Sequence, residues 1–228
     1  MIKLQNICKT FNEGKNNEKK ALKNVSLDVN DGELVAIIGK SGAGKSTLMN
    51  IVACLDTPSS GEYLIDGENT ANFSPSKTAE IRNGYFGVVT QSPFMIDNIT
   101  PLENVVIPLM YDRKNKKDRY RRAAEALASV GIDSGLKVKT AVLSGGEQQR
   151  VSIARAIVNN PRVILADEPT GNLDKENSDV VMKILLNINK EGRTVIVITH
   201  DPDIAAQCGR VVTVSDGEII MDEKNADR

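Results

Sequence analysis

The sequence predicts an α/β fold whose central sheet is mainly parallel. Short apolar runs rich in branched residues, which are typical of buried strands, alternate with helical segments along the chain. These strand segments end at Gly39, Gln91, Asp167 and His200. The carboxyl ends of parallel strands meet at one edge of a sheet, and ligands of such folds bind at that edge. We therefore expect one site built from the residues that end these strands.

An antiparallel β subdomain and an α-helical insertion are expected beside this sheet, within a single domain spanning residues 1–228. Segments 2–27 and 62–66 favour the β subdomain, with Gly61 and Gly67 as turns. Within the insertion, residues 119–130 have apolar side chains at helical spacing. We assign the catalytic core and β subdomain to about 1–90 and 161–220, the helical subdomain to about 92–160, and a loose tail to 221–228.

Composition excludes several classes of protein. The 228 residues are 40% apolar and 26% charged, which is ordinary for a soluble domain, and this length allows roughly 70% of the unfolded surface to be buried. A net charge of −1 gives no general attraction to nucleic acid or to anionic lipid, so neither is expected as a partner. The lysine-rich stretches 12–20 and 112–122 are interpreted as solvated loops or helix faces.

The chain is expected to be cytoplasmic. It has no apolar run near the ~18 residues of a membrane span and no signal peptide, so any membrane association should come through a partner. Cys8, Cys54 and Cys208 are scattered without metal-like spacing, and we expect them to be reduced thiols.

Residues 39–46 match G-x-x-x-x-G-K-[ST] at every fixed position, between an apolar strand at 34–38 and a helix that follows. Such a glycine loop at a helix N-terminus presents backbone N–H groups to phosphates, with Lys45 supplying charge and Ser46 a Mg²⁺ ligand. A glycine-rich surface turn is the alternative, but it does not account for the strand and helix on either side. The expected nucleotide-binding residues are Gly39, Lys40, Ser41, Gly42, Ala43, Gly44, Lys45, Ser46 and Thr47.

An acidic strand end completes a triphosphate site. The apolar run 163–166 leads into Asp167 and Glu168. Asp167 is the candidate for holding Mg²⁺ through water, and Glu168 is the candidate general base for an attacking water. Solvated charges at a strand end would be the default interpretation without the phosphate loop in the same chain.

A second candidate anion site lies at Ser144, Gly145, Gly146 and Glu147. Ser144 and Glu147 form S-x-x-E, the capping box that can begin any helix. The two glycines between them leave a bare helix N-terminus that an anion can approach closely. Because the chain already has one phosphate cradle, this second one indicates contact with the γ-phosphate held by a neighbouring copy.

The motifs at 143–150 (LSGGEQQR) and 167–174 (DEPTGNLD) resemble the signature motif, Walker B motif and D-loop of ABC transporter ATP-binding subunits. The resemblance extends from Ile2 to about Ile220 and is strongest to the macrolide-export, lipoprotein-release and cell-division branch (MacB, LolD, FtsE). It implies the ABC ATPase fold and two copies closing on two ATP molecules with Mg²⁺. It also implies a separate membrane permease of the MacB or FtsX type, with the chain peripheral at the inner face of the membrane.

The same resemblance assigns further residues. Gln91 matches the Q-loop, which reaches Mg²⁺ and the attacking water, and His200, the single histidine of the chain, matches the switch histidine. Phe11 occupies the position of the aromatic residue that stacks on adenine, and Asp174 belongs to the D-loop of the dimer. Lys40 occupies a variable position of the phosphate loop, where it can add positive charge.

The segment 92–105 follows the Q-loop and is apolar, but Pro93 and Pro101 interrupt it, so no regular buried element is expected there. Phe94, Ile99 and Leu102 either pack the insertion on the core or, as the resemblance implies, line a groove for the membrane partner.

The transported substrate is open among macrolide or peptide export, lipoprotein release and resistance to antimicrobial peptides. An FtsE-like regulatory ATPase of cell division is the main alternative. A chromosome or repair ABC ATPase usually has a long coiled coil between the two motifs, whereas the interval here is about a hundred residues without sustained heptads. A translation-associated one usually has two such domains in one chain, and this chain has one.

Overall fold

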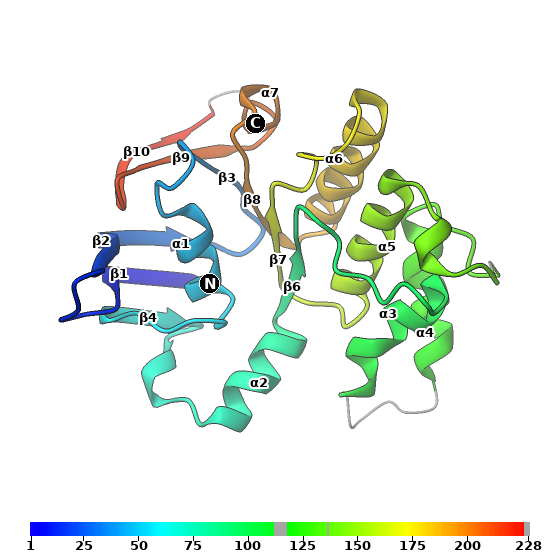
Figure 1. Cartoon of the computed structure of the whole chain (residues 1–228), viewed down its shortest axis with the longest axis horizontal. Coiled ribbons are helices and arrows are strands. Elements are labelled where there is room, and N and C mark those ends of the chain that lie inside the picture. The colour runs from blue at the N-terminus through cyan, green and yellow to red at the C-terminus, as the bar shows by residue number, and fades with distance from the viewer. Residues whose placement is uncertain (112–117, 136, 226–228) are drawn as a thin grey trace.

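The computed structural model describes residues 1–111, 118–135 and 137–225, and two β-sheets organise them (Figure 1). The larger sheet has the strand order β10-β9-β3-β8-β7-β6. Five of its strands are parallel, and β10 pairs antiparallel with β9 at one edge. Its strands are β3 (Leu34–Ile38), β6 (Phe86–Val89), β7 (Val163–Asp167), β8 (Thr194–Ile198), β9 (Arg210–Ser215) and β10 (Glu218–Lys224). The expected mainly parallel α/β core is therefore confirmed.

The smaller sheet is antiparallel, with the strand order β2-β1-β4-β5. Its strands are β1 (Ile2–Phe11), β2 (Lys19–Val29), β4 (Ser60–Ile65) and β5 (Glu68–Asn69). Gly67 lies in the β4–β5 turn, as predicted, but the assignment of Gly61 to a turn is wrong. Gly61 lies within β4 because its backbone packs directly against the backbone of β1 at Asn6.

Helices cover the parallel sheet on both sides and extend beyond it between β6 and β7. Near the sheets lie α1 (Lys45–Val52), α2 (Pro75–Gly84), α6 (Lys175–Lys190), the short α7 (Pro202–Ala205) and the 3-10 turn η1 (Thr70–Asn72). The right-hand side of Figure 1 is formed by α3 (Pro101–Met110), α4 (Arg119–Ser129) and α5 (Gly145–Ile157), with the 3-10 turn η3 (Thr140–Val142) before α5. The amphipathic pattern at 119–130 corresponds to α4, whose Ala123, Ala126 and Leu127 are buried.

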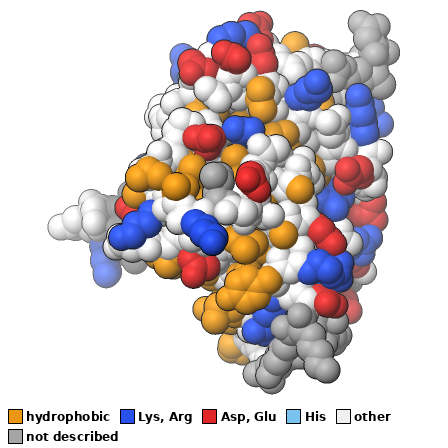
Figure 2. All heavy atoms as spheres, turned by 90° about the vertical axis from the view of Figure 1, so that its right-hand side faces the viewer, with side chains coloured by type: hydrophobic (Ala, Val, Ile, Leu, Met, Phe, Trp, Pro, Cys, Tyr) orange, Lys and Arg blue, Asp and Glu red, His pale blue; other side chains and the backbone are white. Residues whose placement is uncertain are grey.

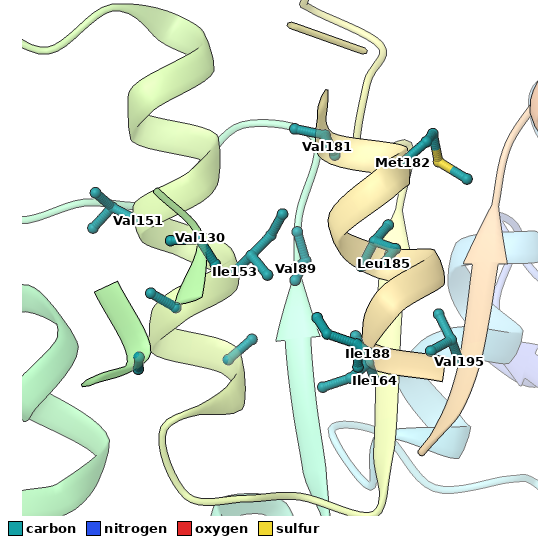
Figure 3. Close-up of a cluster of buried hydrophobic side chains, with 14 of the residues drawn as sticks. Val89, Val130, Val151, Ile153, Ile164, Val181, Met182, Leu185, Ile188 and Val195 are labelled. Atoms are coloured by element: carbon teal, nitrogen blue, oxygen red, sulfur yellow. The ribbon is translucent and has the colours of Figure 1, made fainter. Parts of the chain in front are cut away.

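Two clusters of buried apolar side chains hold these layers together. One lies between the parallel sheet, α1 and the antiparallel sheet, and includes Leu4, Ile37 and Leu48. The other lies between the parallel sheet and α3–α6. Figure 3 shows Val89 of β6 between Ile153 of α5 and Leu185 of α6. Because α5 and α6 share this core, the helical region is packed firmly on the sheet that carries the strand ends.

Three further sequence-based expectations are wrong. Residues 101–105 form the first turns of α3, with Asn104 and Val105 buried, because Pro101 occupies the first helical position, where no N–H is needed. Residues 221–224 are not loose: they belong to β10, where Asp222 pairs with Val212 and forms an ion pair with Arg210. Positions 226–228 of the tail and 112–117 of the lysine-rich stretch are outside the described residues. Lys19 and Lys20 begin β2 instead of extending the loop before it.

Within the described ranges, no helix combines the length and apolarity needed to cross a membrane.

Candidate functional site

A cleft of about 590 Å³ opens at the carboxyl ends of the parallel strands, within the range of small-molecule sites. It brings together residues from the phosphate loop, the ends of β7 and β8, the segment after β6, and β1 and β2. The lining residues are Phe11, Lys19, Ala21, Gly39, Lys40, Ser41, Gly42, Gly44, Lys45, Ser46, Thr47, Gln91, Asp167, Glu168 and His200. Ala43 is buried behind the loop. Lys19 and Ala21 were not predicted, since no local motif marks them.

The phosphate loop lines the cleft and enters α1 through a glycine in the left-handed region. Gly44 caps α1 with φ of 107°, and a Cβ there would lie 2.6 Å from the carbonyl oxygen of Ala21, so only glycine fits. The Lys45 ammonium donates to the carbonyl oxygens of Gly39 (2.7 Å) and Lys40 (3.0 Å). Lys45 is only 9% exposed, so this cation is fixed against the loop.

The acidic end of β7 lies beside this loop. Burial raises the pKa of the Asp167 carboxyl, and the nearby Glu168 raises it further, while a hydrogen bond from Ser46 and the charge of Lys45 oppose the shift. The pair Ser46 and Asp167 therefore places a hydroxyl and a carboxylate oxygen side by side at the loop. Both are the hard oxygen ligands that Mg²⁺ prefers.

Glu168 has an unusual backbone conformation that turns its side chain into the cleft. Its φ is +47°, and its N–H donates to the carbonyl of Ile198 on the neighbouring strand (2.9 Å). Its Oε1 lies 2.9 Å from Nδ1 of His200, and the Glu168 side chain is 17% exposed against 71% for His200. A left-handed conformation at a non-glycine residue costs about 1–3 kcal/mol and is found at functional sites.

Gln91 is positioned by residues that the sequence analysis did not single out. Its Nε2 donates to Oδ1 of Asn172 (3.3 Å), and the Asn172 amide donates back to the Gln91 carbonyl (3.4 Å). Gln149 of α5 donates to the carbonyl of Thr90 (3.2 Å) and is 1% exposed. Asn172 and Gln149 both lie inside the quoted motifs, but no spacing rule connects them to partners that lie 81 and 59 positions earlier.

The region at 144–147 lies apart from the cleft. Ser144 and Glu147 form the predicted capping box at the start of α5, and the hydrogen bonds from Ser144 lower the pKa of Glu147. None of the residues 144–147 is among the described residues that line the cleft. Within one copy, then, the two glycine motifs do not meet, and contact of 144–147 with a nucleotide on a second copy stays a prediction.

Asp174 connects this region to α6. Its carboxylate caps α6 by accepting from the Asn177 backbone N–H (2.8 Å), and it also accepts from the Asn177 side chain (3.0 Å). These bonds lower the pKa of Asp174, with the backbone bond as the largest cause. Asn177 lies so close to Gly146 that a Cβ at 146 would overlap its side-chain amide. Asp174 thus fixes the residue that packs on Gly146.

A family model described as ABC transporter matches residues 22–171. The chain belongs to the ABC transporter family. It is 46% identical to the uncharacterised ABC transporter ATP-binding protein YvrO of Bacillus subtilis, with 98% of this chain and 97% of that protein covered. It is 45% identical to the macrolide export ATP-binding/permease protein MacB of Mannheimia succiniciproducens. That alignment covers 97% of this chain but 34% of MacB, so the chain spans about a third of such relatives.

Solved structures of ABC cassettes have the same fold. A dimeric bacterial ABC transporter cassette, MJ0796, aligns with a TM-score of 0.89 at 42% identity, covering 98% of both chains. A dimeric post-hydrolysis state of MJ0796 bound to ADP and Pi aligns equally well at 41% identity. The ABC ATPase fold is therefore confirmed, and the chain is an ATP-binding, ATP-hydrolysing subunit of an ABC transporter.

Proposed function

We propose that the cleft binds ATP with its phosphates on the loop 39–47 and its adenine against Phe11. The main support for this proposal is that one cleft contains both the buried Lys45 cation and the carboxylates of Asp167 and Glu168 at the end of β7. Lys45 supplies the charge for the β- and γ-phosphates, and the N-terminus of α1 with its backbone N–H groups supplies hydrogen bonds.

Mg²⁺ fits the residues at the loop. Ser46 offers a hydroxyl, Asp167 a carboxylate and Gln91 an amide oxygen, and all three line the cleft. That composition suits Mg²⁺, which keeps several waters and uses substrate phosphates with one or two protein oxygens. Bound there, Mg²⁺ would neutralise charge on the phosphates.

Glu168 is the proposed general base. Its side chain is partly buried and 2.9 Å from His200, which supports a role for the imidazole in orienting the carboxylate; contact of His200 with the γ-phosphate is part of the proposal. Gln91, held by Asn172, is proposed to position the attacking water. The left-handed backbone of Glu168, with its N–H bonded to the Ile198 carbonyl, is of the kind found at functional sites and supports this role.

Two copies of the chain are proposed to face each other, each ATP lying between the loop 39–47 of one copy and residues 144–147 of the other. At the N-terminus of α5, Ser144 and Gly145 are exposed, whereas Gly146 is buried against Asn177, and the helix dipole favours an anion at the exposed end. Asp174, on the segment that packs on Gly146, belongs to the same proposed interface.

The dimer is proposed to drive a membrane permease of the macrolide or peptide export type, from the cytoplasmic face. Support comes from the ATP-binding/permease relatives and from exposed apolar side chains after the Q-loop. Phe94 is 74% and Ile96 50% exposed, whereas Met95 and Leu102 pack on the core. Figure 2 shows apolar side chains gathered over the lower part of the face that carries the helical region.

Lys45→Ala tests the nucleotide site. The variant removes the buried cation that the loop holds, so titration calorimetry should detect no tight ATP binding while the protein still unfolds cooperatively. Lys224→Ala, an exposed lysine of β10, is the matched control and should bind ATP normally. Wild-type affinity in Lys45→Ala would overturn the assignment of the phosphates.

Phe94→Glu tests the permease surface. Because Phe94 is exposed, the variant should fold and hydrolyse ATP as an isolated subunit, yet lose co-purification with its membrane partner. Ile220→Glu, at 64% exposure on β10, is the control for adding a charge to an apolar surface. If Phe94→Glu co-purifies as well as the control, the docking surface lies elsewhere.

A further inference from the structure

The aromatic ring at the nucleobase end of the cleft has a buried cation against it. Phe11 is 38% exposed at the end of β1, and Lys9 lies two residues earlier on the same strand. The Lys9 ammonium is 5.0 Å from the centroid of the Phe11 ring, and the Lys9 side chain is only 12% exposed. A lysine at this distance from an aromatic face forms a cation–π interaction, which strengthens when the cation is removed from water.

The Lys9 ammonium is held in place from its other side. It donates to Oδ1 of Asp56 at 2.6 Å and to the carbonyl of Thr57 at 2.8 Å. Asp56 Oδ1 also accepts the backbone N–H of Thr57 (2.7 Å), so the acceptor is itself fixed. A second bond, from the Thr10 N–H to Ser59 Oγ (3.0 Å), ties the same strand to the same loop.

That loop follows α1, the helix that begins at the phosphate loop. Lys9 and Asp56 therefore connect the Phe11 ring to the loop at the C-terminal end of α1. The N-terminal end of the same helix begins at the phosphate loop. This connection links the two parts of the proposed nucleotide site through side chains that do not line the cleft among the described residues.

Because Lys9 covers one face of the Phe11 ring, a base entering the cleft would stack on the opposite face. Phe11 lines the cleft, while Lys9 is not among the described residues that line it. A cation on one side draws π-electron density toward itself, so the open side carries less negative charge. That side stacks more favourably on an electron-rich purine base.

We propose that Lys9 is a positioning residue for nucleobase binding: it holds the Phe11 ring and polarises it for stacking on adenine. This proposal rests on the proposed placement of adenine against Phe11. It also predicts that Lys9 contributes only to ligands with a base and only when the ring is present.

The test is a double-mutant cycle on ATP affinity. Lys9→Met keeps most of the side-chain stem and removes the charge, and it should weaken ATP binding roughly threefold to tenfold. Phe11→Ala should weaken it more, since base–aromatic stacking is worth about 1–3 kcal/mol, roughly 5- to 150-fold. Lys9→Met in the Phe11→Ala background should then have no effect, and Lys9→Arg should retain wild-type affinity because it keeps a cation at the ring.

Two controls separate this role from general effects. Lys3→Met removes a lysine from the same strand that forms an ion pair with Asp28 (3.5 Å) and has no contact with the Phe11 ring. This variant should leave ATP affinity unchanged. Inorganic tripolyphosphate with Mg²⁺ has no base, so its affinity should be the same for wild type and Lys9→Met.

The outcomes are distinguishable. If Phe11→Ala binds ATP normally, the adenine placement is wrong and this proposal falls with it. When Phe11→Ala weakens binding but Lys9→Met does not, stacking stands and the role of Lys9 is refuted. An equal effect of Lys9→Met with and without Phe11, or on tripolyphosphate, would show that Lys9 acts by another route.

Discussion

Asn104 supports the segment that follows the Q-loop, and its replacement should be strongly destabilising. The side chain is fully buried in α3. Its amide donates to the carbonyls of Ile96 (3.1 Å) and Thr100 (3.2 Å) and to the Thr140 hydroxyl (2.9 Å). Its Oδ1 accepts the Ile96 N–H (2.9 Å). One side chain thus joins the post-Q-loop segment, α3 and the turn that leads into residues 144–147.

The magnitude follows from what Asn104→Ala leaves behind. In this variant the Thr100 carbonyl still accepts the backbone N–H of residue 104, and the Thr140 hydroxyl still donates to the Ile99 carbonyl. These two groups therefore retain a hydrogen-bond partner. The Ile96 N–H, whose bond to Asn104 is partly buried, loses its acceptor, and leaving such a group unpaired costs about 1–3 kcal/mol. With the small cavity, the total should be about 2–4 kcal/mol. For a chain of this length that lowers Tm by roughly 4–16 °C.

Urea denaturation and thermal melts measure this loss. Asn98→Ala, an exposed asparagine in the same segment, is the matched control and should stay within about 0.5 kcal/mol of wild type. If Asn104→Ala and Asn98→Ala unfold at the same urea concentration, the bonds of Asn104 do not stabilise the segment and the reasoning is refuted.

Two other predictions concern the cap residues. Gly146→Ala should lower the free energy of unfolding by about 1–3 kcal/mol, because the new Cβ meets the Asn177 amide, and Asn177→Ala should restore most of it in chemical denaturation. No rescue would contradict that contact. Hydrogen bonds from Thr100, with the backbone bond as the largest cause, lower the pKa of Glu103 below its ordinary value of 4.5. The ionised Glu103 carboxylate therefore stabilises the folded state fully above pH 4.5, and this stabilisation is lost as the pH falls through the pKa of the folded protein. Tm of Glu103→Gln should therefore fall less than that of wild type between about pH 5 and pH 3, and an equal fall would argue against the cap.

Much of the fold follows from local sequence patterns. The buried strand at 34–38 coincides with β3, since an apolar run of this length followed by glycines leaves few alternatives. The capping box at Ser144 and Glu147 is formed as predicted, because its two hydrogen bonds involve residues only three positions apart. Both features depend on neighbours in the sequence, where a single chain carries the information.

Features that depend on distant partners could not be predicted. The tail became strand β10 because Asp222 meets Arg210, which also binds Glu33, and none of these charges stands out locally. Gln149 reaches Thr90 only because α5 packs beside the end of β6. Pro101 was interpreted as an interruption, although the Thr100–Glu103 capping box around it marks the start of a helix.

The central claim is that ATP is held between two copies of this chain, and one measurement tests it most directly. Glu168→Gln keeps the shape of the side chain and removes the base, which typically contributes ~10²–10⁴-fold in rate, so bound ATP should persist. In ATP and Mg²⁺, size-exclusion chromatography with light scattering should then show twice the monomer mass. Adding Ser144→Arg, which blocks the exposed N-terminus of α5, should return the variant to a monomer that still binds ATP. A Glu168→Gln protein that binds ATP yet stays monomeric at high concentration, or a dimer unaffected by Ser144→Arg, would contradict the account.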